Sequence, residues 1–487
     1  MINKNVNEIL INVTPQETRV AVMEQGVVQE IHIERATQLG VVSNVYRGEV
    51  VRVLPGMQSA FVEIGLGRAA FLHVADVMDC NLNDVQTPIQ QVLHEGQSVI
   101  VQVIKEPIGT KGARLTTQIS IAGRFLVFLP QQEHIGVSQR IEDEAEREFL
   151  KNRLTNLLPA NNKSGYIIRT MCETVTDAEL LADIDYLNKV WQNIQIQSVN
   201  TKPRSLVFRD LSLPMRLLRD VLTENTERVL VDSREMYQKL INFAEIYVSN
   251  AVSRIEHYHL DRPMFDIYNM EFEIERALAK KVELKSGGYL IFDQTEAMTT
   301  VDVNTGSFVS GRSLSDTIFK TNLEAAQCIA RQLRLRNLGG IIIIDFIDMI
   351  EDEQREVVLS ELQKDLGLDR ARISVHGFSA LGLVEMTRKR TRESLARVLC
   401  EPCPACEGHG EIKTSQTICY QIFRELLRNS RQFSVREFKL LASAKVIDML
   451  LEEEAQNLAN LCDFMKKPVA LQVETQYAQH IYDIVVL

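Results

Sequence analysis

Two aspartates in the middle of the chain, Asp302 and Asp345, are the residues whose surroundings most clearly indicate chemistry. Each belongs to a short apolar segment, and open α/β sheets bind ligands at the ends of such strands. Neighbouring carboxylates repel each other unless something neutralises them, and a hard divalent cation prefers oxygen ligands of this kind. The pair therefore suggests a metal site. The alternative interpretation is that one aspartate caps a helix or pairs with an arginine.

Two strands and one helix must position these aspartates. The β-branched run Ile341 to Ile344 ends on Asp345 and predicts a buried strand of a covered sheet. Residues 299–303 predict a second strand, which contains Asp302. Between them, apolar residues from 323 to 333 recur at three- and four-residue spacing and predict an amphipathic helix. A single connecting helix lets two neighbouring strands bring the carboxylates together.

A cysteine pair near residue 400 suggests a zinc knuckle. Cys403 and Cys406 are spaced as in C-x-x-C, but a structural zinc needs four ligands and no second C-x-x-C follows. The set could be completed by two cysteines of a partner subunit. Two alternatives remain, namely an iron–sulfur run that begins at Cys400 and a same-chain site that includes His409.

Short predicted strands from Asn44 onward, separated by glycine-containing turns, indicate a small closed barrel of the OB type. Phe61 and Phe71 lie on two of these strands and would stack on unpaired bases if they are exposed. In an anonymous barrel both would more often be core residues. The pattern FVEIG followed by AAFLH is similar to that of the RNA-binding OB module named after a small-subunit ribosomal protein, and this favours base stacking.

Arg169 and Thr170 follow a predicted strand, and a guanidinium beside a hydroxyl suits a terminal phosphate. The alternative is an ion pair with a carboxylate, which is common for arginines at strand ends. A basic run, Arg388 to Arg390 with Arg392 and Arg397, is predicted on a helix. It could form a solvated face or hold a polyanion.

The composition limits the class of protein. With 487 residues, the chain should contain about three or four domains. The net charge of −11 disfavours nonspecific nucleic-acid binding, so any such role must depend on local basic patches. No apolar run approaches the roughly 20 residues needed to cross a bilayer, and the N-terminus lacks a signal-peptide pattern. We expect a cytoplasmic protein with reduced cysteines and no membrane partner.

Taken together, VDVNTG, NLEAAQCIARQLRLRNLGGIIIIDFIDM and CPAC, behind the barrel and a GYIIRT segment, resemble the RNase E/G family of bacterial endoribonucleases. The resemblance covers nearly the whole chain. It implies an α/β multidomain fold in which an RNase H-like domain is interrupted by an OB-fold barrel and a 5′-phosphate sensor, then followed by a DNase I-like catalytic domain, a zinc link and a small α+β domain. The implied bounds, in chain order, are 1–36 (first RNase H-like segment), 37–123 (OB fold), 124–214 (sensor), 215–280 (second RNase H-like segment), 281–399 (catalytic), 400–413 (zinc link) and 414–487 (small domain).

The resemblance also implies roles for individual residues. Asp302 and Asp345 would bind Mg²⁺ with Asn304 orienting the site, and Cys403 and Cys406 would bind Zn²⁺ shared between two subunits. The remaining residues fall into two groups: Phe61, Phe71, Lys111 and Arg372 for RNA binding, and Gly123, Val127, Arg169 and Thr170 for the 5′-phosphate.

The activity implied by the resemblance is Mg²⁺-dependent cleavage of single-stranded RNA, leaving a 5′-phosphate and a 3′-hydroxyl and preferring 5′-monophosphorylated ends. The implied processes are 5′-end maturation of ribosomal RNA precursors and mRNA decay. The implied assembly is a homodimer through the zinc link, with a tetramer as a further option. Two other hypotheses are a non-catalytic RNA-binding scaffold and a DNA nuclease.

Overall fold

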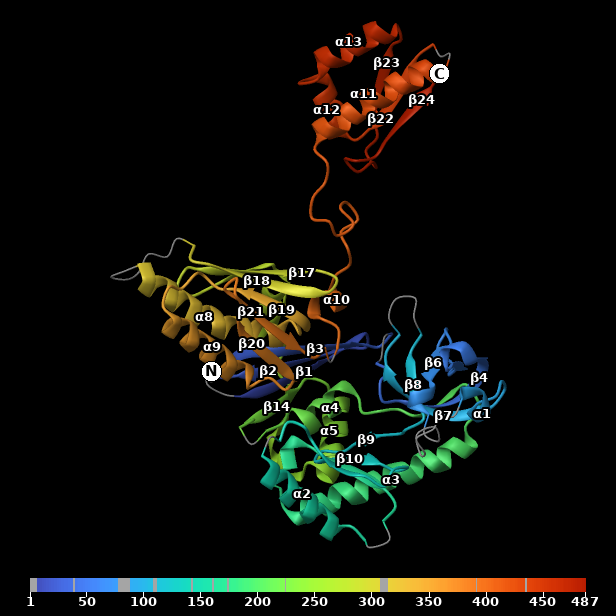
Figure 1. Cartoon of the computed structure of the whole chain (residues 1–487), viewed down its shortest axis with the longest axis vertical. Coiled ribbons are helices and arrows are strands. Elements are labelled where there is room, and N and C mark those ends of the chain that lie inside the picture. The colour runs from blue at the N-terminus through green and yellow to red at the C-terminus, as the bar shows by residue number, and fades with distance from the viewer. Residues whose placement is uncertain are drawn as a thin grey trace. The chain divides into compact units, whose positions relative to one another are not determined.

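The computed structural model of the chain forms two compact units, Met1–Val398 and Leu399–Leu487 (Figure 1). It describes residues 7–37, 40–77, 88–107, 112–141, 143–159, 162–172, 175–223, 225–306, 314–390, 392–433 and 436–487. The fold is mixed α/β and includes a closed five-stranded barrel. Within the described ranges, no helix has the length and apolarity that crossing a membrane requires.

The first sheet combines strands from two distant regions of the first unit. Its order is β15-β14-β1-β2-β3, and the strands are β1 (Glu8–Val13), β2 (Glu17–Glu24), β3 (Val27–Arg35), β14 (Arg228–Val231) and β15 (Ile255–His257). β1 pairs with β14 in parallel. Apolar side chains of this sheet pack on α4 (Leu213–Asp220) and α5 (Arg234–Tyr247). The short helices α6 (Met264–Ile267) and α7 (Met270–Leu278) follow. The N-terminal strands β1 to β3 and the 215–280 segment therefore share one core.

The barrel is the OB-like region of the chain. Its strands are β4 (Val45–Leu54), β5 (Ser59–Glu63), β6 (Ala70–His73), β8 (Arg114–Thr116) and β7 (Ser98–Lys105). They follow that order around the barrel, and β7 pairs back with β4 to close it. β13 (Ser205–Phe208) extends the sheet at β4, and α1 (Ile89–Val92) lies near it. Closure removes the free strand edges of the barrel.

The segment between the barrel and α4 contains a four-stranded sheet with two helices. The strands, in the order β11-β12-β10-β9, are β9 (Ile121–Ala122), β10 (Leu126–Leu129), β11 (Ile135–Val137) and β12 (Gly165–Ile168), and the helices are α2 (Glu144–Leu157) and α3 (Asp177–Asn200). Phe128 and Tyr166 pack at its centre with their ring centroids 5.0 Å apart. Thr176 and Glu179 form a capping box that fixes the start of α3.

A six-stranded sheet carries the aspartate pair. Its order is β16-β17-β18-β19-β21-β20, and the strands are β16 (Lys281–Glu283), β17 (Tyr289–Gln294), β18 (Met298–Asn304), β19 (Gly340–Asp345), β20 (Ile373–Phe378) and β21 (Leu383–Arg388). The helix predicted between the aspartates is confirmed as α8 (Leu314–Leu335). It packs against α9 (Asp352–Leu366), and side chains from both helices enter the core of the sheet.

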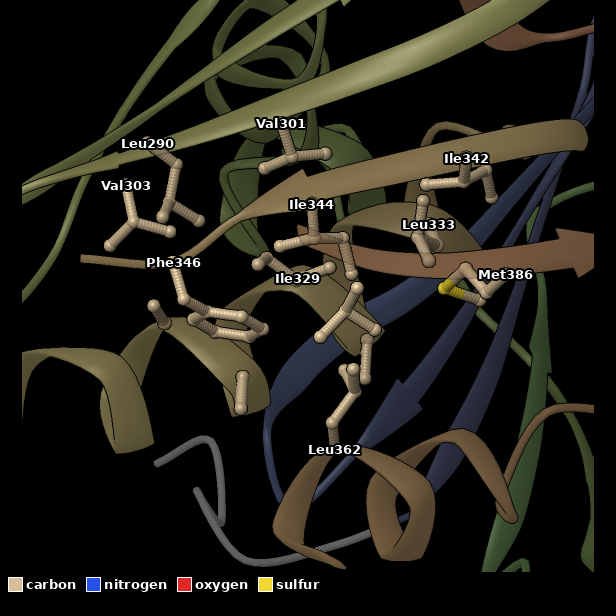
Figure 2. Packing of buried hydrophobic residues seen from close by; sticks show 14 of the residues in the cluster. Leu290, Val301, Val303, Ile329, Leu333, Ile342, Ile344, Phe346, Leu362 and Met386 are labelled. Atoms are coloured by element: carbon tan, nitrogen blue, oxygen red, sulfur yellow. The ribbon is translucent and has the colours of Figure 1, made fainter. Parts of the chain in front are cut away.

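Among the described residues, helices cover only one face of this sheet. Ile342 and Ile344 are fully buried and point with Val301 towards α8 and α9 (Figure 2). Ile341, between glycine and Ile342, is 47% exposed. The prediction of a strand buried on both faces is therefore wrong for β19. The β-branched run gave no signal of this, because alternate residues of one strand face opposite sides whatever their type.

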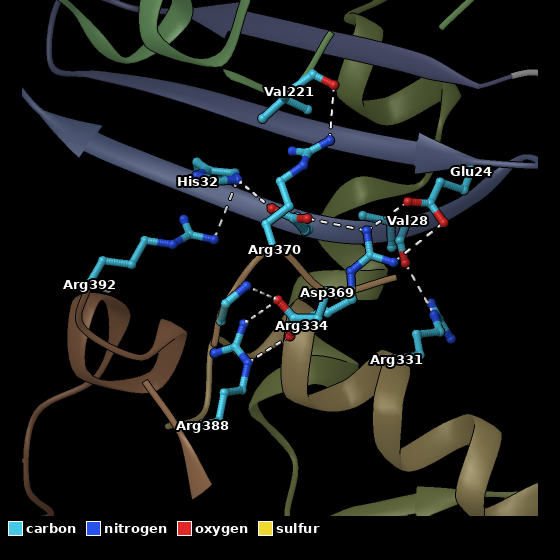
Figure 3. A network of polar contacts seen from close by, with 12 residues as sticks. Glu24, Val28, His32, Val221, Arg331, Arg334, Asp369, Arg370, Arg388 and Arg392 are labelled. Atoms are coloured by element: carbon cyan, nitrogen blue, oxygen red, sulfur yellow. Dashed lines mark hydrogen bonds and ion pairs between the residues drawn. The ribbon is translucent and has the colours of Figure 1, made fainter. Parts of the chain in front are cut away.

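Arginines late in α8 join the six-stranded sheet to the first sheet (Figure 3). Arg334 pairs with Glu24 at 2.6 Å and with Glu30 at 3.2 Å, and Arg331 donates to the carbonyl of Val28. Removing one partner of a buried ion pair of this kind leaves an uncompensated buried charge, which lowers the free energy of unfolding by about 3–5 kcal/mol. These contacts fix the orientation of α8.

Of the basic run after β21, only Arg397 lies on a helix as predicted. Arg388 is the last residue of β21 and the helix α10 (Leu395–Leu399) begins only later. Arg388 is buried against Asp369 (Figure 3). Arg392 donates to the carbonyl of Ile31 in the first sheet. Of the five basic residues, Lys389, Arg390 and Arg397 are the exposed ones, so the run divides into members held by the fold and members that face solvent.

The second unit contains a three-stranded sheet in the order β23-β22-β24. Its elements are α11 (Ser415–Gln432), β22 (Phe438–Ala442), α12 (Ala444–Leu451), α13 (Ala455–Met465), β23 (Val469–Val473) and β24 (Tyr482–Val486). The sequence predicts a helix followed by strands, and the structure adds two helices between β22 and β23. Leu426, Phe438 and Leu450 belong to its own apolar core.

Candidate active site

Asp302 and Asp345 occupy directly opposed positions on two parallel strands. In the register of β18 and β19, Val301 faces Ile344 and Asp302 faces Asp345. Strands in a sheet lie about 4.8 Å apart, so the two carboxylates leave neighbouring backbone positions. Both side chains are exposed on the face of the sheet that no helix covers. The structure thus brings the two residues together as the connecting helix predicted.

Asn304 orients one of these carboxylates. Its side-chain amide donates a hydrogen bond of 2.8 Å to Oδ2 of Asp302. Asn304 lies two residues further along β18, so both side chains stand on the same face of the strand. The bond leaves the Oδ1 atom of Asp302 available for another ligand.

The charge at this strand end is not neutralised by the described regions of the protein. No lysine, arginine or histidine forms an ion pair with Asp302 or Asp345 among the described residues. Partial burial, the charge of Asp302 and the charge of Asp348 together raise the pKa of Asp345. A group of carboxylates that raises the pKa of one member in this way is an environment that a divalent cation would stabilise.

The donor set fits Mg²⁺ better than a cation that needs an all-protein cage. Within the described ranges, no three His, Cys, Asp or Glu side chains approach closely enough to hold one metal ion. Mg²⁺ is commonly held by one or two carboxylates and keeps several waters. Asp302 and Asp345 would hold it, with Asp348 adding negative charge nearby.

Asp348 was missed by sequence reasoning, although a signal was present. It lies three residues after Asp345 in the segment DFID, where a tight loop can return a side chain towards the strand end. Its Oδ1 lies 3.8 Å from the position that a Cβ on Gly382 would occupy, at the turn that leads into β21. The loop after β19 and the turn before β21 therefore meet beside the aspartate pair.

The two phenylalanines of the barrel lie side by side. Phe61 on β5 faces Phe71 on β6 in the strand register, and their ring centroids are 6.2 Å apart in an edge-to-face arrangement. Both are half-buried rather than core residues. His73, two residues after Phe71, continues the same face with its ring centroid 6.4 Å from that of Phe71. Lys111 lies outside the described residues.

The four residues expected around a 5′-phosphate converge on one small sheet. Gly123 and Val127 belong to the β9–β10 hairpin, and β12, which ends just before Arg169, pairs with β10. Arg169 donates to the carbonyl of Gly123 at 2.6 Å. Thr170 begins the short helical turn η4 (Thr170–Cys172) directly afterwards.

Arg169 also forms the ion pair that the alternative interpretation anticipated. Its Nη2 lies 2.9 Å from Oδ1 of Asp220 at the end of α4, and Arg219 binds the same carboxylate. Two guanidinium groups thus share one carboxylate. Burial raises the pKa of Asp220, but Arg219 and Arg169 lower it overall. Asp220 was not predicted from sequence, because its contact with Arg169 is purely tertiary.

The backbone beside Arg169 is held by another buried carboxylate. Asp183 of α3 accepts hydrogen bonds from the N–H groups of Arg124, Phe125 and Leu126. A Cβ on Gly123 would lie only 2.6 Å from the Asp183 oxygens, so this close approach requires glycine. The hairpin is therefore preorganised, but these three N–H groups are already occupied.

Arg372 lies just before the edge strand β20 of the six-stranded sheet and is exposed. Its Nη1 donates a 3.2 Å hydrogen bond to Gln139, which belongs to the segment between β11 and α2. The residue thus lies where the small sheet with Arg169 meets the six-stranded sheet. The contact between Arg372 and Gln139, like that between Arg169 and Asp220, was not predicted from the sequence.

Cys403 and Cys406 form a compact turn in the second unit. The N–H of Glu407 donates to the carbonyl of Cys403, and that of His409 to the carbonyl of Cys406. Hydrogen bonds from the N–H groups of Gly410 and Gly408 lower the pKa of Cys406, which favours the thiolate that metals require. In the described regions of the chain, no third ligand joins the pair, and this includes Cys400 and His409.

Comparison with known proteins gives a consistent result. Residues 120–391 match the family model described as the ribonuclease E/G family. Ribonuclease G of Escherichia coli strain K12 is 51% identical over 488 residues, covering 99% of both chains. Ribonuclease G of Haemophilus influenzae is 47% identical, with the same coverage. Ribonuclease E of Nostoc is 36% identical over 402 residues, which are 82% of this chain and 58% of the relative.

Proposed function

The chain belongs to the ribonuclease E/G family and is an endoribonuclease, and we propose that it uses Mg²⁺ to cleave single-stranded RNA. The observation that carries the proposal is the opposed pair Asp302 and Asp345, whose charge no ion pair neutralises in the described structure. On the same family relationship, the six-stranded sheet is DNase I-like and the first sheet RNase H-like. The substrates proposed are ribosomal RNA precursors, at their 5′ side, and mRNAs in the cytoplasm.

The residues of the strand ends would divide the work of catalysis. Asp302 and Asp345 would hold the cation, and Asn304 would keep the Asp302 carboxylate in one orientation through its 2.8 Å hydrogen bond. When bound, the ion would supply positive charge against the phosphate oxygens and increase the acidity of water. Water attacks phosphorus and the bond to the 3′ oxygen breaks, which leaves a 5′-phosphate and a 3′-hydroxyl.

The barrel would restrict the substrate to unpaired RNA. Phe61 and Phe71 present an edge-to-face pair on the barrel surface, and such rings stack on bases that are not already stacked in a duplex. Lys111 and Arg372 are proposed as phosphate contacts on the basis of the family relationship. This specificity depends on local groups, because the net charge of the chain is −11.

A 5′-monophosphate would be recognised through a change of partner. Arg169 and Arg219 both pair with Asp220, so this carboxylate neutralises Arg169 only in part. A phosphate that approaches Arg169 can therefore compete with Asp220 for it. The phosphate can accept two parallel hydrogen bonds from Arg169, and Thr170, the next residue in the chain, would add its hydroxyl. Gly123 and Val127 would then line the pocket.

The proposed activity is tested with matched single-stranded RNA and DNA oligomers, with and without Mg²⁺. Asp302→Asn and Asp345→Asn should each lower RNA cleavage by about a thousandfold or more, because each removes one of two charged ligands. RNA binding in EDTA should change little. Asp293→Asn is the matched control, since Asp293 is paired with Lys280 in the same sheet.

Three outcomes would contradict the proposal. Full cleavage by either variant at limiting Mg²⁺ would show that the pair does not hold the cation. Binding without cleavage by the wild type would indicate a scaffold. Preference for the DNA oligomer would indicate a DNA nuclease.

We also propose that Cys403 and Cys406 bind one Zn²⁺ together with the same residues of a second subunit, forming a homodimer. The support is that the described residues of one chain provide two thiols and no further ligand, whereas structural zinc takes four. Cys403→Ala or Cys406→Ala should lose zinc and shift the protein towards monomer, as seen by metal analysis and light scattering. One zinc per chain in the wild type would point instead to Cys400 or His409. A tetramer would appear as a second, zinc-independent step.

A further inference from the structure

The open face of the six-stranded sheet contains a second feature, at the opposite end from the aspartates. A hollow of about 610 Å³ lies there, and its lining includes Ile341, Arg372, Thr387, Lys389 and Arg390. The strand register shows what forms its floor. Ile341 on β19 and Thr387 on β21 line it and are paired, and Met298 on β18 pairs with Ile341 at the border of the hollow.

The floor of this hollow is unusually apolar for an open sheet face. Ile341 on the floor is 47% exposed, and its register neighbour Met298, at the border of the hollow, is 36% exposed. Side chains of this size normally face the core, because burying each contributes about 1.5–3 kcal/mol. The opposite face of the same strands is fully packed, so these two residues are not needed for the core of the sheet.

Cations surround this floor. Lys389 and Arg372 lie opposite each other at the edge, because the Lys389 N–H donates to the Arg372 carbonyl. Arg390 lies across the backbone of Gly340, where a Cβ would approach its Nη2 to 3.0 Å, and its Nε donates to the carbonyl of Gly339. Among the described residues, no carboxylate forms an ion pair with the Lys389 Nζ or the Arg390 Nη groups, and Glu296 is the one acid that lines the hollow.

We propose that this hollow, lined by Ile341, Lys389 and Arg390 and bordered by Met298, is a subsite for the RNA strand on one side of the bond to be cleaved. The apolar floor would contact the faces of bases, and the cations would contact the phosphates that follow. This inference rests on the proposed function. It adds to that function a substrate-binding surface built from the six-stranded sheet itself.

The geometry places the subsite at a distance that a continuous strand can bridge. Ile341 precedes Asp345 by four residues on β19, which corresponds to about 13 Å along the strand. The intervening row carries Thr300 on β18, Ile343 on β19 and Glu385 on β21. An RNA strand that follows β18 and β19 would pass over Thr300 and Ile343. Its phosphates would then stay away from the carboxylate of Glu385 on β21.

Charge favours RNA over a second copy of the chain as the occupant. In a two-fold interface the same patch meets itself, so Lys389, Arg390 and Arg372 of both copies would face one another. An RNA strand instead brings one negative charge per phosphate to these cations. The combination of exposed apolar side chains and cations is also the combination that single-strand binding surfaces use.

The test measures RNA binding without cleavage, by fluorescence anisotropy in EDTA, with single-stranded RNAs of about 6 and about 14 nucleotides. The full-length protein should bind the longer RNA more tightly. Lys389→Ala should reduce the slope of log Kd against log salt for the longer RNA by about 0.7, because one phosphate contact is lost. Ile341→Ser should weaken binding of the longer RNA about three- to tenfold with the slope unchanged.

Lys364→Ala is the matched control. Lys364 is a 70% exposed lysine on α9, which packs against the covered face of the sheet, so its loss should change neither slope nor affinity. Equal effects of Lys389→Ala and Lys364→Ala would overturn the proposal. So would a change in oligomeric state on light scattering caused by Ile341→Ser without a change in RNA binding, since a second copy would then cover the floor.

Cleavage assays separate this inference from the proposed function. If the wild type cleaves both RNAs but Lys389→Ala and Ile341→Ser keep the full advantage of the longer RNA, the subsite is wrong and the endonuclease assignment stands. If the wild type cleaves neither RNA while the two variants still lose binding of the longer one, the proposed function fails and the subsite stands.

Discussion

Two aspartates of the six-stranded sheet region have opposite electrostatic surroundings. Asp369, before β20, pairs with Arg388 at 2.7 Å, and their side chains are only 4% and 5% exposed. Asp345, at the end of β19, is exposed, and burial together with Asp302 and Asp348 raises its pKa. A carboxylate that is neutralised by an ion pair within the chain has a structural role. A carboxylate whose negative charge remains is available for a ligand that the chain does not supply.

The basic run after β21 shows the same division within a few residues. Arg388 and Arg392 are hydrogen-bonded to other regions of the fold, whereas Lys389 and Arg390 are exposed beside the hollow. In the sequence, these residues cannot be told apart as structural or available, because all are basic and lie close together. Their partners, which only the folded chain provides, decide which are structural.

The comparison of the two aspartates predicts opposite effects of the same substitution. Asp369→Asn should lower the free energy of unfolding by about 3–5 kcal/mol, because Arg388 would keep its buried charge without a carboxylate. Asp345→Asn should not lower the free energy of unfolding, because it breaks no ion pair among the described residues and relieves the repulsion from Asp302 and Asp348. Urea unfolding followed by circular dichroism measures both. Asp352→Asn, which breaks an exposed pair with Arg355, is the control and should cost at most about 1 kcal/mol.

Arg169 is the intermediate case, because it is paired with Asp220 yet 27% exposed. If it binds a 5′-monophosphate, Arg169→Ala should slow cleavage of monophosphorylated RNA about tenfold to a hundredfold, the equivalent of about 1.5–3 kcal/mol. Cleavage of hydroxyl-ended RNA should scarcely change. Arg153→Ala removes another arginine of the same segment, paired with Asp177, and should not discriminate between the two RNAs. Equal slowing of both RNAs by Arg169→Ala would place it with Arg388 as a structural residue.

His32 extends the comparison to a buried group that remains neutral. Burial and the charge of Arg392 lower the pKa of His32 to about 4, although Glu30 opposes this shift (Figure 3). In the unfolded chain its pKa is about 6.5, so the unfolded state takes up the proton first as the pH falls. The contribution to stability is therefore present above pH 6.5 and is lost between about 6.5 and 4.

Lowering the pH from 7 to 5 should thus cost about 2 kcal/mol through His32 alone. Urea unfolding of the wild type and of His32→Gln at both pH values measures this difference. The variant should lose that share of the pH dependence, whereas His94→Gln, at an exposed histidine, should retain it. An unchanged pH dependence in His32→Gln would show that the histidine is already protonated in the folded protein.

The sequence predicted the aspartate pair because that prediction required only local patterns. Two β-branched segments joined by one helix limit the arrangement of Asp302 and Asp345 to neighbouring strands. The contact between Arg169 and Asp220 could not be predicted in this way, since it joins the end of β12 to helix α4, which no local pattern relates. The exposure of Ile341 was missed for a similar reason, because residue type does not reveal which face of a sheet lacks helices.

The parallel pairing of β1 with β14 has a consequence for how the chain is made. β14 begins at Arg228 and β1 ends at Val13, so more than 200 residues are synthesised before the first strand finds this partner. At about 5–20 residues per second, the wait lasts roughly 10 to 45 s. During that time the barrel, whose strands all lie between the two, can close first. The N-terminal hairpins therefore present an unpaired edge to the ribosome surface and to chaperones for longer than any other strands of the first sheet.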